Sequence, residues 1–199
     1  MGVHYLQIQG TAMGTKMAPS YANIFMGHLE GQLLMAVPLT PYRWLRFIDD
    51  IDMQWSHGQD NLKIFLELAN NFHTSIKFTS EISNTQHVFL DTVSRIEGNN
   101  LITDLYSKPT DSHQYLLLTS CHPPHCCRNI PFSLALRIRR ICTQKSDFEI
   151  RTKELSDQLC RRVYNNTKVS QSITKAGNLQ REDLLKYKSK THNTRTRWP

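Results

Sequence analysis

Apolar positions at the start of the chain follow helical spacing and then switch to a strand-like pattern. From Tyr21 the apolar residues recur at helical spacing until Pro38, which predicts one buried helix after a glycine-containing loop. Residues 42–48 are aromatic-rich and β-prone, and residues 51–55 resume that pattern after Asp49-Asp50. The two segments therefore predict a short hairpin with two carboxylates at its tip.

A second helix and further strands follow. Residues 62–72 define an amphipathic helix, and residues 76–82 then alternate apolar with polar side chains, as in a half-buried strand. Residues 87–95 and 101–107 flank Glu97-Gly98-Asn99-Asn100, a turn rich in residues that tolerate positive φ. These two segments predict a second hairpin.

Beyond Pro109 the pattern becomes helical and basic. Pro131 opens a predicted helix whose apolar face is bordered by arginines. A second helix is predicted from Ser146, because Ser146 and Glu149 have the spacing of a capping box. A third is predicted from Val169 to Leu184.

Charge divides the chain in a similar way. Residues 1–120 contain 7 Lys plus Arg and 11 Asp plus Glu, and residues 121–199 contain 17 and 6, so the balances of −4 and +11 sum to +7. An acidic part followed by a strongly basic part predicts core or cation chemistry in the first and a polyanion partner for the second. A soluble surface rich in lysine would produce the same balance.

Composition excludes several classes of protein. With 199 residues, of which 39% are hydrophobic, the chain has enough apolar residues for a core and is not typical of a disordered protein. It has neither an apolar run long enough to span a membrane nor the order of a signal peptide, so we expect an intracellular protein without a membrane partner. Five cysteines, all beyond residue 120, do not predict a disulfide framework.

Asp49 and Asp50 are the first candidates for chemistry. Two adjacent carboxylates in a tight turn repel each other, and a divalent cation removes that cost. Oxygen ligands suit Mg²⁺, and nucleotidyl transfer needs carboxylates that hold two such ions about 3.5 to 4 Å apart. The same pair also occurs in many solvent-exposed turns without any catalytic role.

Several motifs together resemble one known family. The segment Gln9-Gly10-Thr11-Ala12-Met13-Gly14-Thr15 is similar to the loop that reverse transcriptases place ahead of their catalytic hairpin, and Phe47-Ile48-Asp49-Asp50 looks like their aromatic-x-Asp-Asp box. More narrowly, the chain from Tyr5 to Leu185 resembles the reverse transcriptases of Penelope-like retroelements, relatives of telomerase reverse transcriptase. The further motifs are Phe89-Leu90-Asp91, Tyr106-Ser107-Lys108-Pro109, His122-Pro123, Ile130-Pro131 and Arg137-Ile138-Arg139-Arg140.

This resemblance implies an α+β fold, an incomplete right-hand polymerase. Residues 1–115 would form a partial palm of antiparallel strands packed on helices, with a catalytic hairpin and a primer-grip-like hairpin. Residues 116–199 would form a basic, all-α thumb and a truncated C-terminal tail. Asp49 and Asp50 would bind two Mg²⁺ ions and catalyse addition of a dNTP to a DNA primer on an RNA template.

The resemblance also implies roles for residues around that site. Gln9 and Gly10 would line the template and nucleotide side, and Phe47 would pack below the carboxylates. Contacts to the nucleic-acid backbone would come from five thumb arginines, Arg137, Arg139, Arg140, Arg161 and Arg162.

The chain also departs from the family pattern. It starts after the strand that carries a third metal-binding aspartate and after the fingers, and the only acidic residue before Arg43 is Glu30. The resemblance therefore implies a fragment of a polyprotein, inactive or nearly so without the missing fingers and palm, and resident in the nucleus.

Two other functions remain open. A non-enzymatic nucleic-acid-binding remnant would keep the basic part without a working metal site, although such arginines also form ordinary solvated faces. A zinc-binding interaction module would use Cys121-His122-x-x-His125-Cys126-Cys127. These ligands are too closely spaced for one tetrahedral site, so we do not expect zinc.

Overall fold

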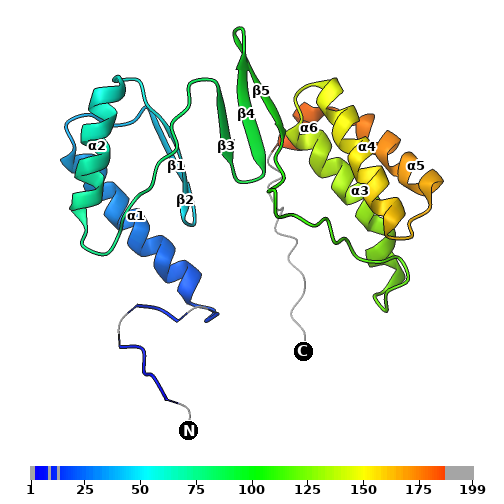
Figure 1. The fold of residues 1–199 in the computed structure, drawn as a ribbon, viewed down its shortest axis with the longest axis horizontal. Coiled ribbons are helices and arrows are strands. Elements are labelled where there is room, and N and C mark those ends of the chain that lie inside the picture. The colour runs from blue at the N-terminus through cyan, green and yellow to red at the C-terminus, as the bar shows by residue number, and fades with distance from the viewer. Residues whose placement is uncertain (1–2, 9, 13, 187–199) are drawn as a thin grey trace, which may run out of the picture. The chain divides into compact units, whose positions relative to one another are not determined.

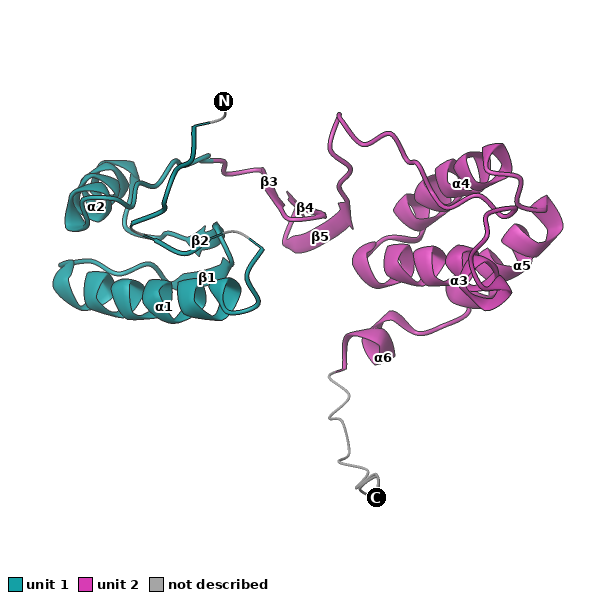
Figure 2. Ribbon diagram, turned by 90° about the horizontal axis from the view of Figure 1, so that it is seen from below, with its two compact units in different colours: residues 1–82 teal, residues 83–199 magenta. Residues whose placement is uncertain are grey.

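The computed structural model describes residues 3–8, 10–12 and 14–186 and divides into two compact units, residues 1–82 and 83–199 (Figures 1 and 2). The boundary expected at residue 115 therefore falls inside the second unit. The described residues form a mixed α/β structure with two small antiparallel sheets and six helices. This arrangement does not confirm a polymerase palm and thumb. No helix among these residues has the length and apolar character needed to cross a membrane.

The first unit contains two helices and one hairpin. Helix α1 (Ala18–Ala36) is followed by β1 (Arg43–Phe47), which pairs antiparallel with β2 (Asp50–Gln54), as the hydrophobic pattern predicts. Helix α2 (Gln59–Phe72) places Phe65 against the hairpin, with its ring centroid 6.0 Å from that of Trp44 and 5.2 Å from that of Trp55. Trp44 and Trp55 thus pack on α2 in the interior of this unit.

Residues 76–82 do not form the predicted strand. The Asn70 side chain of α2 instead binds both backbone groups of Phe78. Its Oδ1 accepts from the Phe78 N–H at 2.6 Å, and its Nδ2 donates to the Phe78 carbonyl at 3.1 Å. One amide side chain thereby satisfies the groups that a neighbouring strand would otherwise have bound.

The second unit begins with a sheet in the order β3-β4-β5, formed by β3 (Gln86–Phe89), β4 (Thr92–Glu97) and β5 (Asn100–Leu105). The expected turn is present, with Gly98 at a φ of +60° and Glu97 opposite Asn100. The preceding segment is two strands rather than one, because the chain reverses at Leu90-Asp91. Leu90 has a φ of +55° in that turn.

Four helices follow, and their ends differ from the predicted ones. Helix α3 (Pro124–Ile141) starts earlier than expected because Pro124 occupies its first turn, where a missing N–H costs nothing, and Pro131 lies buried inside the helix. Helix α4 (Lys145–Arg161) begins before Ser146, so the predicted capping box does not form. The third predicted helix is divided into α5 (Asn166–Gly177) and α6 (Arg181–Leu185).

Helices α3, α4 and α5 share one hydrophobic core. Its buried members are Ala135, Ile138, Cys142, Phe148, Leu155, Leu159, Tyr164, Val169 and Ala176. Gly177 lies at the end of α5 against Phe148, and a Cβ at this position would be 3.2 Å from Cε1 of that ring. Glycine therefore allows the last turn of α5 to approach α4 closely.

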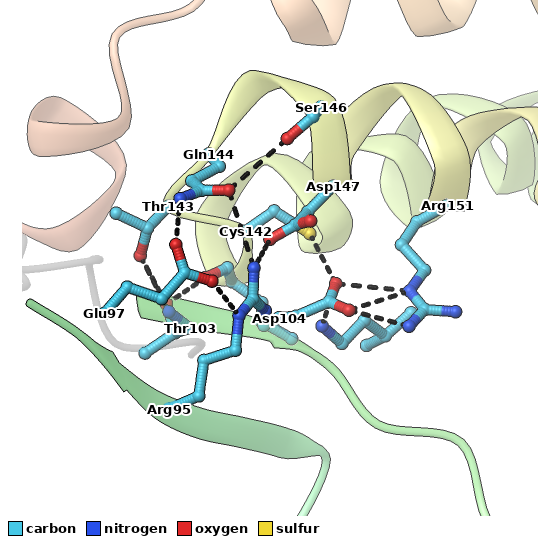
Figure 3. A network of polar contacts seen from close by, with 12 residues as sticks. Arg95, Glu97, Thr103, Asp104, Cys142, Thr143, Gln144, Ser146, Asp147 and Arg151 are labelled. Carbon is cyan, nitrogen blue, oxygen red and sulfur yellow. Dashed lines mark hydrogen bonds and ion pairs between the residues drawn. The ribbon is translucent and has the colours of Figure 1, made fainter. Parts of the chain in front are cut away.

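A polar network attaches the sheet to the turn between α3 and α4 (Figure 3). The Thr103 N–H donates to Thr143 Oγ1 at 3.1 Å, and the Thr143 N–H donates to the Thr103 carbonyl at 2.9 Å. Arg95 of β4 donates to Asp147 Oδ2 at 2.9 Å, at the start of α4. The sheet thus fixes the position from which α4 begins.

Asp104 is the buried carboxylate of this network. It is 8% exposed and accepts hydrogen bonds from Arg151 Nη2 at 2.6 Å and from Cys142 Sγ at 3.4 Å. Burial acts to raise the pKa of Asp104, but hydrogen bonds from Arg151 and from the Leu105 N–H outweigh it and hold that pKa below its usual range. Burial, aided by the Asp104 carboxylate, raises the pKa of Cys142 to about 12. The pair is therefore a carboxylate and a thiol at neutral pH.

Candidate nucleic-acid interface

Helices α4 and α5 are joined by a short turn, residues 162–165. The N–H groups of Arg162 and Tyr164 both donate to the Leu159 carbonyl, at 2.9 and 3.1 Å, and Val163 between them has a φ of +69°. Asn165 caps α5, because its side chain accepts from the Lys168 N–H at 3.2 Å. Connections of three or four residues between helices are typical of helix-turn-helix motifs.

Helix α5 exposes a face of uncharged polar residues. Val169 and Ala176 are buried on the opposite side of the helix, against the core. The exposed residues at i, i+3, i+4 and i+7, here named the α5 stripe, are Thr167, Ser170, Gln171 and Thr174. Lys168 and Lys175 flank the stripe, and α5 contains neither Asp nor Glu. A polyanion would meet no repulsive charge on this helix.

The three core helices differ in charge. Helix α3 also contains no acidic residue and carries Arg128, Arg137, Arg139 and Arg140. Helix α4 has acidic residues that balance its basic ones, namely Asp147, Glu149, Glu154 and Asp157. The helices without acidic residues, which would repel a polyanion, are therefore α3 and α5.

Three of the five predicted phosphate-contact arginines have partners within the protein. Arg137 pairs with Asp91 through Nε, at 2.9 Å, and through Nη2. Arg139 donates to the Leu179 carbonyl at 3.1 Å and lies over the Phe148 ring. Arg162 donates to the Tyr115 carbonyl at 2.6 Å. These side chains hold loops against the helices.

Arg140 and Arg161 are exposed, and no described residue accepts a hydrogen bond or ion pair from either side chain. Lys168, in the first turn of α5, is also exposed, and its side chain has no hydrogen-bond or ion-pair partner among the described residues. Sequence reasoning missed Lys168, although its position just after a short turn, in a helix without acidic residues, was a usable signal. Arg140, Arg161 and Lys168 are here called the free cations.

The free cations lie near both ends of α5. Arg161 directly precedes the turn, and Lys168 follows it. The backbone of Arg140 lies near the segment that follows α5, because its carbonyl accepts a hydrogen bond from Arg181 Nε at 3.0 Å and the neighbouring Arg139 donates to the Leu179 carbonyl. Positive charge is thus available near both ends of α5.

The predicted catalytic residues lie in the first unit, at the tip of the β1–β2 hairpin. Asp49 is in the turn, Asp50 starts β2 opposite Phe47, and both carboxylates are exposed. Arg46 holds this tip to α1, since its Nε donates to Glu30 Oε1 at 2.7 Å and its Nη1 donates to the Ile48 carbonyl at 3.0 Å.

The other residues expected around this tip are not gathered there by the described structure. Phe47 is 55% exposed rather than packed. Gly10 lies in the loop before α1, and Gln9 falls outside the described residues. No three His, Cys, Asp or Glu side chains come together as a metal site in the part of the chain that the structure describes. Magnesium binding by Asp49 and Asp50 stays a prediction.

The cysteines and histidines of residues 121–127 do not all lie in one loop, because α3 begins at Pro124. Cys127 is buried in the first turns of α3, with its Sγ 3.9 Å from the Leu117 carbonyl, whereas Cys121 is exposed and precedes the helix. Cys126 Sγ lies 3.5 Å from His125 Nε2.

Comparison with known proteins points to the second unit. Residues 114–174 match the family model described as the animal helix-turn-helix domain. This range includes α3, α4, the short turn and most of α5. No curated protein and no solved structure matches the chain.

The resemblance to the reverse transcriptases of Penelope-like retroelements is wrong, because no reverse transcriptase family model matches and the helical region matches a different family. The structure gives a local reason for the aromatic-x-Asp motif that had suggested a reverse transcriptase catalytic hairpin. Phe47-Ile48-Asp49 and Phe89-Leu90-Asp91 both occur at tight turns between antiparallel strands, with Ile48 and Leu90 at φ values of +58° and +55°. In this chain the motif accompanies a hairpin turn.

Proposed function

We propose that this protein binds double-stranded DNA through residues 114–177, with α5 in the major groove. The observation that carries the proposal is an exposed α5 without acidic residues, placed after a four-residue turn within a region that matches an animal helix-turn-helix domain. In helix-turn-helix proteins the second helix of the motif enters the major groove, and residues of its N-terminal part contact base edges. A nuclear location follows from such a partner and belongs to the proposal.

The free cations supply the electrostatic part of this binding. Arg161 and Lys168 near the start of α5, and Arg140 near its end, are exposed and available to DNA phosphates. Because each neutralised phosphate releases condensed counterions, three such contacts predict a slope of about −2.7 for the logarithm of the affinity against that of salt concentration.

Fluorescence anisotropy with a labelled DNA duplex of mixed sequence, titrated with the full chain at several salt concentrations, tests the proposal. We expect Lys168→Ala to weaken binding several-fold and to make the salt slope shallower by about 0.9. The matched control is Lys153→Ala, which removes an exposed lysine from α4, close in sequence to Glu149 and Glu154.

The result that overturns the proposal is absence of duplex binding at low salt, or an equal loss of affinity in both variants. Equal losses would show that only net charge matters and that α5 has no special role.

A further inference from the structure

The α5 stripe has the chemistry of a base-reading surface. No described residue bonds to the side chains of Thr167, Ser170, Gln171 or Thr174. By contrast, the neighbouring Ser172 hydroxyl donates to the Lys168 carbonyl at 2.9 Å, within the helix. The donors and acceptors of the stripe are therefore available to a ligand.

Gln171 lies about midway along the length of the stripe. It lies one helical turn from Thr167 and next to Ser170 and Thr174 on the same face. Its long amide extends further from the helix than the hydroxyls around it, so it reaches deepest into a groove that the stripe faces.

Charged residues on α5 lie beside this stripe and not in it. Helix α5 has no arginine, Lys168 is on the flank, and Lys175 places its Nζ 4.8 Å from the centroid of the Phe132 ring. Arginine and lysine are the side chains that contact O6 and N7 of guanine, whereas glutamine pairs with N6 and N7 of adenine and threonine contacts the methyl group of thymine.

We propose that the α5 stripe selects A·T base pairs in the major groove, with the Gln171 amide bound to one adenine. The inference rests on the proposed DNA binding and adds the base pair that is recognised. Gln171 thereby determines specificity, while the free cations contribute affinity that does not depend on sequence.

The test begins with selection of duplexes from a random library by the full chain, followed by affinity measurements on the selected duplex. A series of duplexes of the same length is measured beside it, and each carries a single A·T to G·C exchange at one selected position. We expect A·T pairs at the core of the selected site and a loss of about tenfold for the most sensitive exchange.

Three variants separate base reading from general affinity. Gln171→Ala is expected to abolish the tenfold discrimination at one position, so that the A·T and G·C versions of that position bind with similar affinity. Gln171→Arg is expected to favour G·C at that same position, because arginine binds guanine O6 and N7. Lys168→Ala is expected to weaken all duplexes by the same factor. Circular dichroism and thermal unfolding test whether each variant is folded, and we expect no change because each alters only an exposed side chain.

The outcomes distinguish the two proposals. Selected sites rich in G·C, or discrimination unchanged in Gln171→Ala, overturn the inference while DNA binding stands. If no duplex binds at low salt, or if single-stranded RNA binds more tightly than every duplex, the proposed function is overturned and this inference with it.

Discussion

Asp104 is a carboxylate whose charged state depends on Arg151, which lies 47 residues further along the chain. Removal of the guanidinium in Arg151→Met leaves the buried carboxylate without its cationic partner, and we expect the free energy of unfolding at neutral pH to fall by about 2 kcal/mol. Urea denaturation measures the change. The control is Lys153→Met, an exposed lysine of the same helix, for which we expect a change within about 0.5 kcal/mol.

The same pair predicts a pH dependence. The folded-state pKa of Asp104 lies below the ordinary value of 3.8, so its contribution to stability is complete above that value and is lost as the pH falls through the folded pKa. In Arg151→Met, burial acts on Asp104 without the opposing guanidinium and raises its pKa. As the pH falls, the carboxylate of this variant is therefore protonated at a higher pH than in the unaltered protein. We expect the difference in stability to be constant between pH 7 and about pH 5 and to shrink below pH 4. A difference that grows in acid would contradict this account.

Val163 is held by the turn between α4 and α5 in a backbone conformation that is unfavourable for its residue type. It is 57% exposed and β-branched, yet it has a φ of +69° in the turn between α4 and α5. A left-handed conformation costs an L-residue roughly 1 to 2 kcal/mol, and glycine avoids this cost but loses about 0.5 to 1 kcal/mol through chain entropy. We therefore expect Val163→Gly to raise the Tm by a few degrees in calorimetry. Val163→Ala keeps most of the strain and should not raise it, so an equal gain from both would exclude strain as the cause.

At the scale of the element, α5 depends on its N-cap. Asn165→Ala removes the bond to the Lys168 N–H and should lower the free energy of unfolding by about 1 kcal/mol. Asn165→Asp keeps an acceptor at the cap and should retain stability, because a carboxylate is favourable at a helix N-terminus. The same carboxylate would repel phosphates beside the groove. Chemical denaturation together with DNA titration should therefore show Asp as the stable variant with weaker DNA binding.

At the scale of the whole molecule, charge follows the two compact units. Residues 1–82 contain 5 Lys plus Arg and 7 Asp plus Glu, and residues 83–199 contain 19 and 10, so their balances of −2 and +9 sum to +7. We expect a fragment of residues 83–199 to bind duplex DNA within about threefold of the full chain and with the same salt slope, since the free cations and α5 are all in it. Anisotropy titration measures both quantities. Strong binding by residues 1–82 alone would contradict this division.

The elements that the sequence predicted are those specified by neighbouring residues. The hairpin around Gly98 formed as expected, because a residue that tolerates positive φ lies between two β-prone segments. The strand expected at residues 76–82 did not form, because the Asn70 side chain of α2 binds the backbone of Phe78. The alternation of polar and apolar residues in this segment does not reveal a partner on α2. Helix α3 began before its predicted start because Pro124 was available in its first turn.

The sequence by itself determined the basic character of the second part, the helical spacing of its segments and the expectation of a polyanion partner, since charge and periodicity are local properties. Only the tertiary structure decided which arginines are free. Arg137, Arg139 and Arg162 bind groups 40 to 47 residues away, whereas Arg140 and Arg161 have no such partner among the described residues. Contacts over that separation depend on how helices pack, so the spacing of residues along the chain does not reveal them.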